Sequence, residues 1–201
     1  MDVDKVLEAL RGGGVVVYPT ETLYAIGCMA TDHAACVRVA ATKARDMGKP
    51  LPLIIGSLQG LEAVTGDVPD MVRELAGAFW PGPLSILVKA RKGLSPLVSD
   101  DEGYTSVRLS PHPVAAELSR RAEAPLVATS ANRSGLPATA DPDRLDPALL
   151  AGVDAAYLEE PRPLGGEPST VVRVLGDRHL EIVRLGAVGV EQLCQKGFVP
   201  A

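Results

Sequence analysis

Short apolar runs alternate with amphipathic stretches along the chain. Residues 2–11 place Val3, Val6, Leu7 and Leu10 on one face at helical spacing, which predicts an amphipathic helix. The same criteria predict further helices at 33–43, in one short turn after Ser57, at 69–79, from Pro111 or Pro113 onward and at 188–196, and strands at 15–18, 51–55, 84–88, 104–109, 125–129, 153–158, 170–175 and 180–185.

The order of these elements predicts the fold class. Strands and helices alternate irregularly, and the later strands follow one another without helices between them. This order favours an α/β fold with a mixed parallel and antiparallel sheet over a strictly alternating, doubly wound one. The 201 residues contain no internal repeat and no interdomain linker, and this length suits one hydrophobic core. A single domain over residues 1–201 is therefore predicted.

The composition narrows the class of protein further. Hydrophobic residues make up 46% of the chain, which excludes a disordered protein, and no apolar run approaches the roughly 18 residues of a membrane-spanning helix. No basic segment precedes an apolar one at the start, so a cytoplasmic protein without membrane contact is expected. The 20 basic and 25 acidic residues give a net charge of −5, and only 3% of residues are aromatic. Both values count against a non-specific nucleic-acid binder.

The cysteines and histidines do not form a convincing metal site. Three cysteines without an export signal argue against a disulfide framework. Cys28, His33 and Cys36 lie within nine positions, but no paired fourth ligand follows them. Cys36 also shares the apolar face of the second helix with Val37 and Ala40, so buried thiols are favoured over zinc.

Cationic and hydroxyl side chains gather at the ends of the predicted strands and of the second helix. Open α/β sheets bind their ligands at the carboxyl ends of strands, so these groups predict one anion-binding cavity. Neither a GxxxxGK[ST] loop nor a GxGxxG turn between strand and helix is present. The groups are the hydroxyls of the loop after the first strand, Lys43, Arg45, Lys49, Arg108, Ser130, Asn132, Ser169 and Arg184.

Two functions of other classes could use the same residues, but they fit the sequence less well than a small-molecule site in such a cavity. An RNA-binding module could bind the phosphate backbone with this basic cavity, and salt-sensitive RNA affinity without enzymatic turnover would distinguish it. A serine hydrolase using Ser130 lacks a nearby base in any known motif order.

Five motifs in order then indicate a known family. They are VVVYPTETLYAIG, the Lys43–Arg45 pair followed by KPLPLII, WPGPLSILV, SVRLSPHP and ATSANRSGLP. Over about residues 8–190 the chain resembles the YrdC family of threonylcarbamoyl-AMP synthases, in its short single-domain form. The resemblance implies a twisted open mixed sheet flanked by helices, around a large concave cavity lined by positive charge.

The resemblance also implies an activity and its partners. The family forms L-threonylcarbamoyladenylate and pyrophosphate from L-threonine, bicarbonate and ATP, the first step of the t6A modification of tRNA. Mg²⁺ is expected to be held mainly through the ATP phosphates, with no metal site of the protein itself. Proteins that transfer the threonylcarbamoyl group to tRNA are implied as downstream partners, with at most weak direct contact to tRNA or other RNA.

Site roles carry over position by position from the same resemblance. Lys43 and Arg45 are implied as the catalytic pair facing the ATP phosphates. Apart from the resemblance, the Pro- and Gly-rich loop at 133–147 is a candidate cover for the cavity. A guanidinium fork suits a carboxylate bidentately, which fits the implied hold of Arg108 on the threonine carboxylate. The implied threonine contacts are Thr22, Arg108, Ala128 and Ser169, and the implied ATP contacts are Lys43, Arg45, Lys49, Ser130, Asn132, Ala138 and Arg184.

Overall fold

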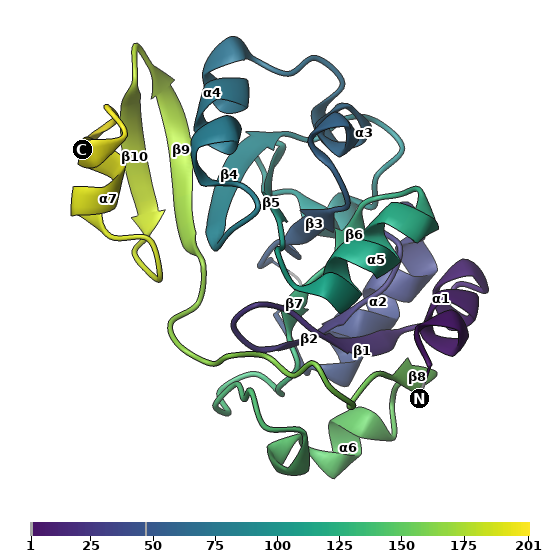
Figure 1. Ribbon diagram of the computed structural model, residues 1–201. Helices are drawn as coiled ribbons and strands as arrows, with labels where there is room; N and C mark the ends of the chain where they lie inside the picture. The colour runs from purple at the N-terminus through teal and green to yellow at the C-terminus, as the bar shows by residue number, and fades with distance from the viewer. Residues whose placement is uncertain (1, 47) are drawn as a thin grey trace.

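The structure is a computed structural model that describes residues 2–46 and 48–201 (Figure 1). Its helices are α1 (Val3–Arg11), α2 (His33–Thr42), α3 (Leu61–Thr65), α4 (Asp70–Phe79), α5 (Pro113–Ala122), α6 (Pro147–Leu150) and α7 (Val190–Gln195), with short 3-10 turns at Leu58–Gly60, Pro96–Val98 and Pro142–Arg144. Its strands are β1 (Val16–Pro19), β2 (Tyr24–Gly27), β3 (Leu53–Ile55), β4 (Leu84–Lys89), β5 (Tyr104–Leu109), β6 (Leu126–Val127), β7 (Thr129–Ser130), β8 (Ala155–Ala156), β9 (Thr170–Gly176), β10 (His179–Arg184) and β11 (Val199–Pro200).

The strands form two mixed sheets. The smaller has the order β7-β2-β1-β8, and the larger has the order β11-β10-β9-β4-β5-β3-β6. Both contain parallel and antiparallel pairs: β1 runs antiparallel to β2 and parallel to β8, while β4 runs antiparallel to β5 and parallel to β9. The predicted α/β class with mixed pairing is therefore confirmed. The expectation of one sheet is corrected, because the chain divides its strands between two.

The division follows from a strand that the sequence prediction missed. Residues 20–27 were expected to form a loop because of their hydroxyls, yet Tyr24–Gly27 is fully buried and pairs with both β1 and β7. Only the turn at 20–23 is irregular, and the apolar residues after it continue as a strand. The strand expected at 125–129 is likewise split into β6 and β7, which pair in different sheets.

The first two helices begin at aspartate caps. The Asp2 carboxylate accepts from the Asp4 amide at 3.4 Å, and the Asp32 carboxylate accepts from the Ala35 amide at 2.9 Å. The expectation that Val37 faces inward is wrong: its side chain is 37% exposed. The buried face of α2 instead turns through Ala35, Cys36, Val39 and Ala40.

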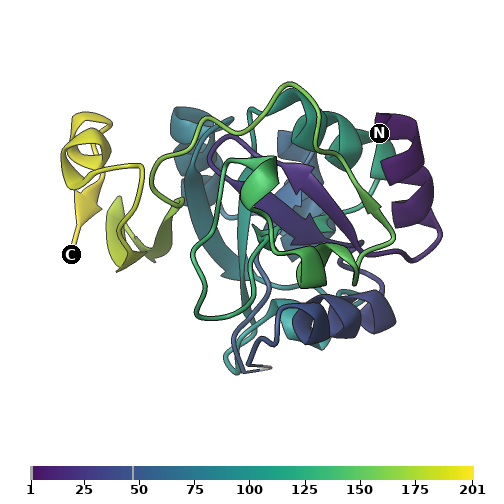
Figure 2. The ribbon, with the colours of Figure 1, turned by 90° about the horizontal axis from the view of Figure 1, so that it is seen from below.

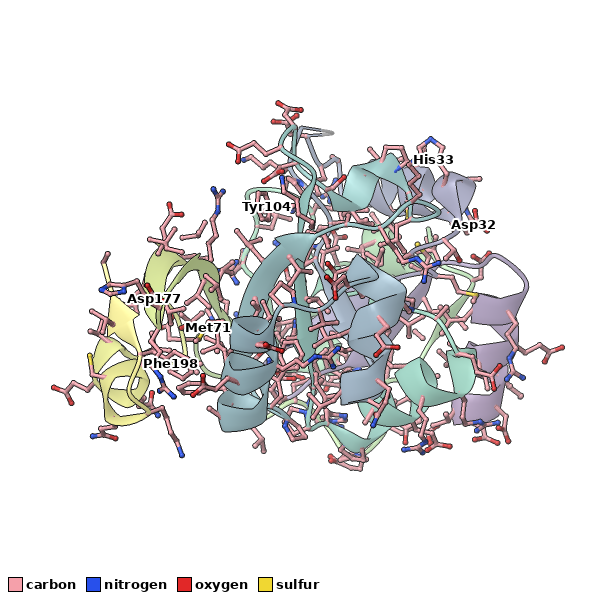
Figure 3. The ribbon with its side chains drawn as sticks, turned by 90° about the horizontal axis from the view of Figure 1, so that it is seen from above. Asp32, His33, Met71, Tyr104, Asp177 and Phe198 are labelled. Atoms are coloured by element: carbon pink, nitrogen blue, oxygen red, sulfur yellow. The ribbon has the colours of Figure 1, made fainter. Side chains whose placement is uncertain are left out.

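The core lies on the faces of the sheets that the helices cover. Helices α1 and α5 pack together against β1 and β3, with Val6, Leu7, Leu10 and Leu118 at most 2% exposed. The β9–β10 hairpin and α7 extend to one side of the body (Figure 2). There Phe198 lies beside Met71 of α4 (Figure 3) and its ring centroid is 6.1 Å from that of Phe79. A long connection runs from β8 back to β9 (Figure 1).

Within residues 2–46 and 48–201, no helix has the length and apolar character needed to cross a bilayer.

Candidate active site

A cavity of about 330 Å³ is lined by residues of both sheets. The small sheet contributes the turn between β1 and β2 and the strand β7, and the large sheet contributes β4, β5, β10 and the start of β9. Three of the lining residues are arginines, and no described lining residue is acidic. The lining residues are Thr20, Thr22, Leu23, Tyr24, Ala25, Arg45, Pro50, Pro52, Ser85, Ser106, Arg108, Ala128, Thr129, Ser130, Ala138, Pro168, Ser169, Val171 and Arg184.

The backbone holds two of these arginines in place. Arg45 donates through Nε to the Lys49 carbonyl at 3.2 Å and through Nη2 to the Pro50 carbonyl at 3.0 Å. Arg184 donates through Nε and Nη2 to the Ser169 carbonyl, at 3.2 and 2.7 Å. Burial lowers the pKa of both guanidinium groups, and for Arg184 the charge of Arg108 adds to this effect. Two fixed positive charges therefore line the cavity, one from the segment after α2 and one from the end of β10.

The third arginine is held by a carboxylate. Arg108 Nε donates to Glu21 Oε1 at 3.0 Å, and Ser110 Oγ donates to Glu21 Oε2 at 2.5 Å. The two charged side chains are only 7% and 10% exposed. Burial alone would raise the pKa of Glu21, but the charge of Arg108 and the hydrogen bond from Ser110 together lower it below 4.5. Glu21 is therefore ionised at neutral pH.

Lys43 lies behind the Ser130–Asn132 loop instead of lining the cavity. Its side chain is 2% exposed, and its ammonium donates to the Ser130 carbonyl, to the Asn132 carbonyl at 2.6 Å and to Asn132 Oδ1 at 3.4 Å. Three donors thus meet three acceptors of one loop. Burial, together with the nearby charge of Arg45, lowers the pKa of Lys43 to about 8.

Eight of the eleven sequence-predicted site residues line this cavity. Thr22, Arg45, Arg108, Ala128, Ser130, Ala138, Ser169 and Arg184 are brought together, while Lys43, Lys49 and Asn132 lie outside the lining. Asn132 is next to the cavity, since Ser130 Oγ donates to its Oδ1. Lys49 contributes its carbonyl to Arg45.

The sequence analysis missed several hydroxyls and one carboxylate. Ser85 and Ser106 line the cavity, and Ser85 Oγ lies 2.9 Å from Ser169 Oγ. Strand alternation could have found Ser106, because it stands two residues before Arg108 on the same strand face. Glu21 had no comparable signal, since its partner is 87 positions away in the chain.

The prediction that Cys28 and Cys36 are buried thiols is confirmed. Cys28 and Cys36 are buried with their sulfurs 3.7 Å apart, whereas His33 turns its Nδ1 to Ser95 Oγ at 2.9 Å. His33 lies at the start of α2, beside Asp32 (Figure 3). His112 caps α5 by accepting from the Val114 amide. No cluster of three His, Cys, Asp or Glu side chains that could hold a metal occurs among the residues described.

These observations define an α/β protein with an arginine-lined cavity between two mixed sheets. A family model described as telomere recombination, covering the Sua5, YciO and YrdC proteins, matches residues 8–186. The chain therefore belongs to the Sua5/YciO/YrdC family.

Relatives and solved structures agree with this assignment. The threonylcarbamoyl-AMP synthase of Stenotrophomonas maltophilia is 34% identical over 172 residues, covering 82% of this chain and 92% of that protein. The threonylcarbamoyl-AMP synthase of Chromohalobacter salexigens is 36% identical over 170 residues, covering 81% and 87%.

Among solved structures, E. coli YciO has a TM-score of 0.81 at 26% identity, over 95% of this chain and 92% of its own. P. abyssi Sua5, solved with L-threonine, has a TM-score of 0.90 at 25% identity over 99% of this chain. The chain spans only 58% of that longer protein.

Proposed function

We propose that this protein is a threonylcarbamoyl-AMP synthase, a nucleotidyltransferase that acts on L-threonine, bicarbonate and ATP. The observation that carries the proposal is the cavity itself: three arginines and several hydroxyls, with no acidic lining residue among those described, in a chain whose relatives bear that name. Such a lining suits the substrates, since carboxylate, bicarbonate and triphosphate are all anions.

The reaction requires anions to approach one another. The threonine nitrogen and bicarbonate combine, with loss of water, to an N-carboxy anion. Its carboxylate oxygen attacks the α-phosphorus of ATP, and the bond to the departing pyrophosphate breaks. Fixed cations screen the repulsion and stabilise the charge that develops on the phosphate oxygens. No side chain needs to form a covalent intermediate in this sequence.

Arg45 and Arg184 are proposed to face the phosphates, and Arg108 to hold the threonine carboxylate. Both backbone-held arginines are fixed before any ligand arrives, so little reorganisation accompanies the reaction. The remaining proposed threonine contacts are Thr22, Ala128 and Ser169, and the remaining ATP contacts are Ser130, Asn132, Ala138 and Lys49.

Lys43 is proposed to act mainly through the loop it holds. All three of its acceptors belong to Ser130 and Asn132, so a direct phosphate contact would require the ammonium to leave them. Mg²⁺ is proposed to enter as MgATP and to neutralise phosphate charge, because no described lining residue offers a carboxylate ligand. The product would then serve proteins that modify tRNA.

The test measures pyrophosphate release with ATP, Mg²⁺, bicarbonate and L-threonine, and then with each component omitted. Release only from the complete mixture, with threonylcarbamoyladenylate detected by mass, is expected. Arg45→Ala and Arg184→Ala should abolish it without unfolding the protein, whereas the surface variant Arg120→Ala should not. Threonine-independent release, or full activity in Arg45→Ala, would contradict the proposal. An RNA-binding module is not favoured, since the named relatives are synthases.

A further inference from the structure

Glu21 occupies the turn between β1 and β2, and the backbone of this turn is fixed on both sides. The Thr20 amide donates to the Leu23 carbonyl at 3.1 Å, and Thr20 Oγ1 donates to the same oxygen at 2.7 Å. The connection that returns from β8 also grips the turn, because the Leu164 amide donates to the Glu21 carbonyl at 3.2 Å. The Glu21 side chain therefore leaves a backbone that has little freedom.

The carboxylate of Glu21 is oriented by a directional chain of hydrogen bonds. The His112 amide donates to Ser110 Oγ at 3.2 Å, so the hydroxyl proton of Ser110 is left for Glu21 Oε2. The other oxygen, Oε1, accepts from Arg108 Nε. Both oxygens are thus engaged, and Glu21 is absent from the cavity lining. Glu21 does not itself offer an oxygen to a ligand.

The bond to Glu21 sets the orientation of the Arg108 guanidinium. A bond to Nε fixes the plane of the group, and within the described part of the chain Arg108 makes no other hydrogen bond. Its two terminal nitrogens remain for the cavity that Arg108 lines. Two parallel N–H groups match a carboxylate bidentately, but only when the plane is set correctly.

A nearly buried ion pair is a costly arrangement, because both ions lose their hydration. A purely structural role would be served as well by an apolar pair of similar volume. We propose that Glu21 is a positioning residue, which sets the guanidinium of Arg108 for the carboxylate of the amino-acid substrate. The inference rests on the proposed function, since that function supplies the carboxylate.

Two substitutions of Glu21 separate the effect of side-chain length from the effect of charge. Glu21→Asp keeps the charge but shortens the side chain by one methylene, so one carboxylate can no longer span Arg108 and Ser110. Glu21→Gln keeps the length and an oxygen that can accept from Nε, but loses the charge. If orientation of Arg108 is what matters, Glu21→Asp weakens threonine binding more than Glu21→Gln. Glu117→Asp, at the more exposed ion pair with Arg121, is the matched control.

The experiment compares two probes, L-threonine and L-threoninamide, which lacks the carboxylate. We expect Glu21→Asp to raise the KM for threonine by roughly 10- to 100-fold, the loss typical of a hydrogen bond to a charged group. In Glu21→Asp, the inhibition constant of threoninamide and the KM for ATP should stay unchanged. In the control Glu117→Asp, the melting temperature should stay unchanged. A substrate-dependent loss of this kind isolates the contact to the carboxylate.

Equal weakening of both probes would show a general structural role and overturn the inference. So would an unchanged KM for threonine in Glu21→Asp, or a larger loss in Glu21→Gln. If Glu21→Asp does not fold, the comparison of both probes in Glu21→Gln and Ser110→Ala decides the question by the same criterion. A wild-type protein that makes no threonylcarbamoyladenylate would instead remove the proposed function, and the inference with it.

Discussion

Gly186 allows a close approach between the end of the β10 segment and the wall of the cavity. A Cβ atom at this position would lie 2.1 Å from the Pro168 carbonyl oxygen and 3.0 Å from the carbonyl carbon and oxygen of Ser169. The Gly186 amide also donates to Thr170 Oγ1 at 2.9 Å, which ties the two segments together. Gly186→Ala therefore sets an added methyl against backbone that has no room to rotate away.

The size of the required movement follows from these distances. Ordinary van der Waals contact begins near 3.4 Å, so the Pro168 carbonyl must retreat by 3.4 − 2.1 = 1.3 Å. Ser169 follows it in the chain, lines the cavity and accepts two hydrogen bonds from Arg184 through its carbonyl. The displacement thus moves a cavity hydroxyl and an arginine anchor at once.

Overpacking of this kind costs about 1–3 kcal/mol of unfolding free energy. For a chain of this size that corresponds to a fall in melting temperature of roughly 2–4 °C for each kcal/mol. A displacement of about 1 Å in a substrate-positioning element costs on the order of 100-fold in kcat/KM. Thermal unfolding and threonine-dependent pyrophosphate release measure the two effects separately.

Gly77→Ala is the matched control, because nothing lies within 4 Å of its added Cβ on α4. Alanine in a helix interior gains about 0.5–1 kcal/mol over glycine, so this variant should melt slightly higher than wild type and keep its activity. If Gly186→Ala melts and reacts like wild type, the reasoning from the close approach is wrong.

Two further predictions concern pH. As pH rises above about 8, Lys43 should lose its proton and loosen the Ser130–Asn132 loop, so the KM for ATP should increase above that pH. Lys43→Arg, which stays charged, should not show this increase. A KM for ATP that does not change with pH in the wild type would contradict the prediction. The folded-state pKa of Glu21 is lowered, so its stabilising contribution is complete above pH 4.5 and is lost as pH falls through the folded pKa. The melting temperatures of wild type and Glu21→Gln should therefore converge in acid, and a constant gap would refute this assignment.

Local pattern was enough to predict most elements, because it depends on neighbouring residues. The apolar spacing at 2–11 reappears in the structure almost residue for residue. Tyr24–Gly27 was missed because the hydroxyls before it suggested a longer loop, although its own residues are apolar. Pairing with β1 across a short turn and with β7, which lies far along the chain, decides its state.

The candidate site, like the fold, was predictable only where local sequence patterns were enough. Strand ends predicted that Arg108 and Arg184 meet at one cavity, since open α/β sheets bind their ligands at the carboxyl ends of strands. The direction of Lys43 could not be predicted, because its acceptors sit on a loop 87 positions later in the chain. Motif spacing reports which residues gather, whereas the buried partner of each charge depends on the tertiary fold.

The way the cavity arginines are anchored has a consequence for substitution and design. In Arg45 and Arg184, Nε and Nη2 are committed to the protein, and in Arg108 Nε alone is committed. A guanidinium can therefore bond to the protein through one edge and remain available to an anion through the other. A lysine has a single nitrogen at the end of a flexible stem, and it cannot hold both positions as rigidly. Exchange of any of these arginines for lysine would keep the charge of the cavity, but the position of that charge would no longer be fixed.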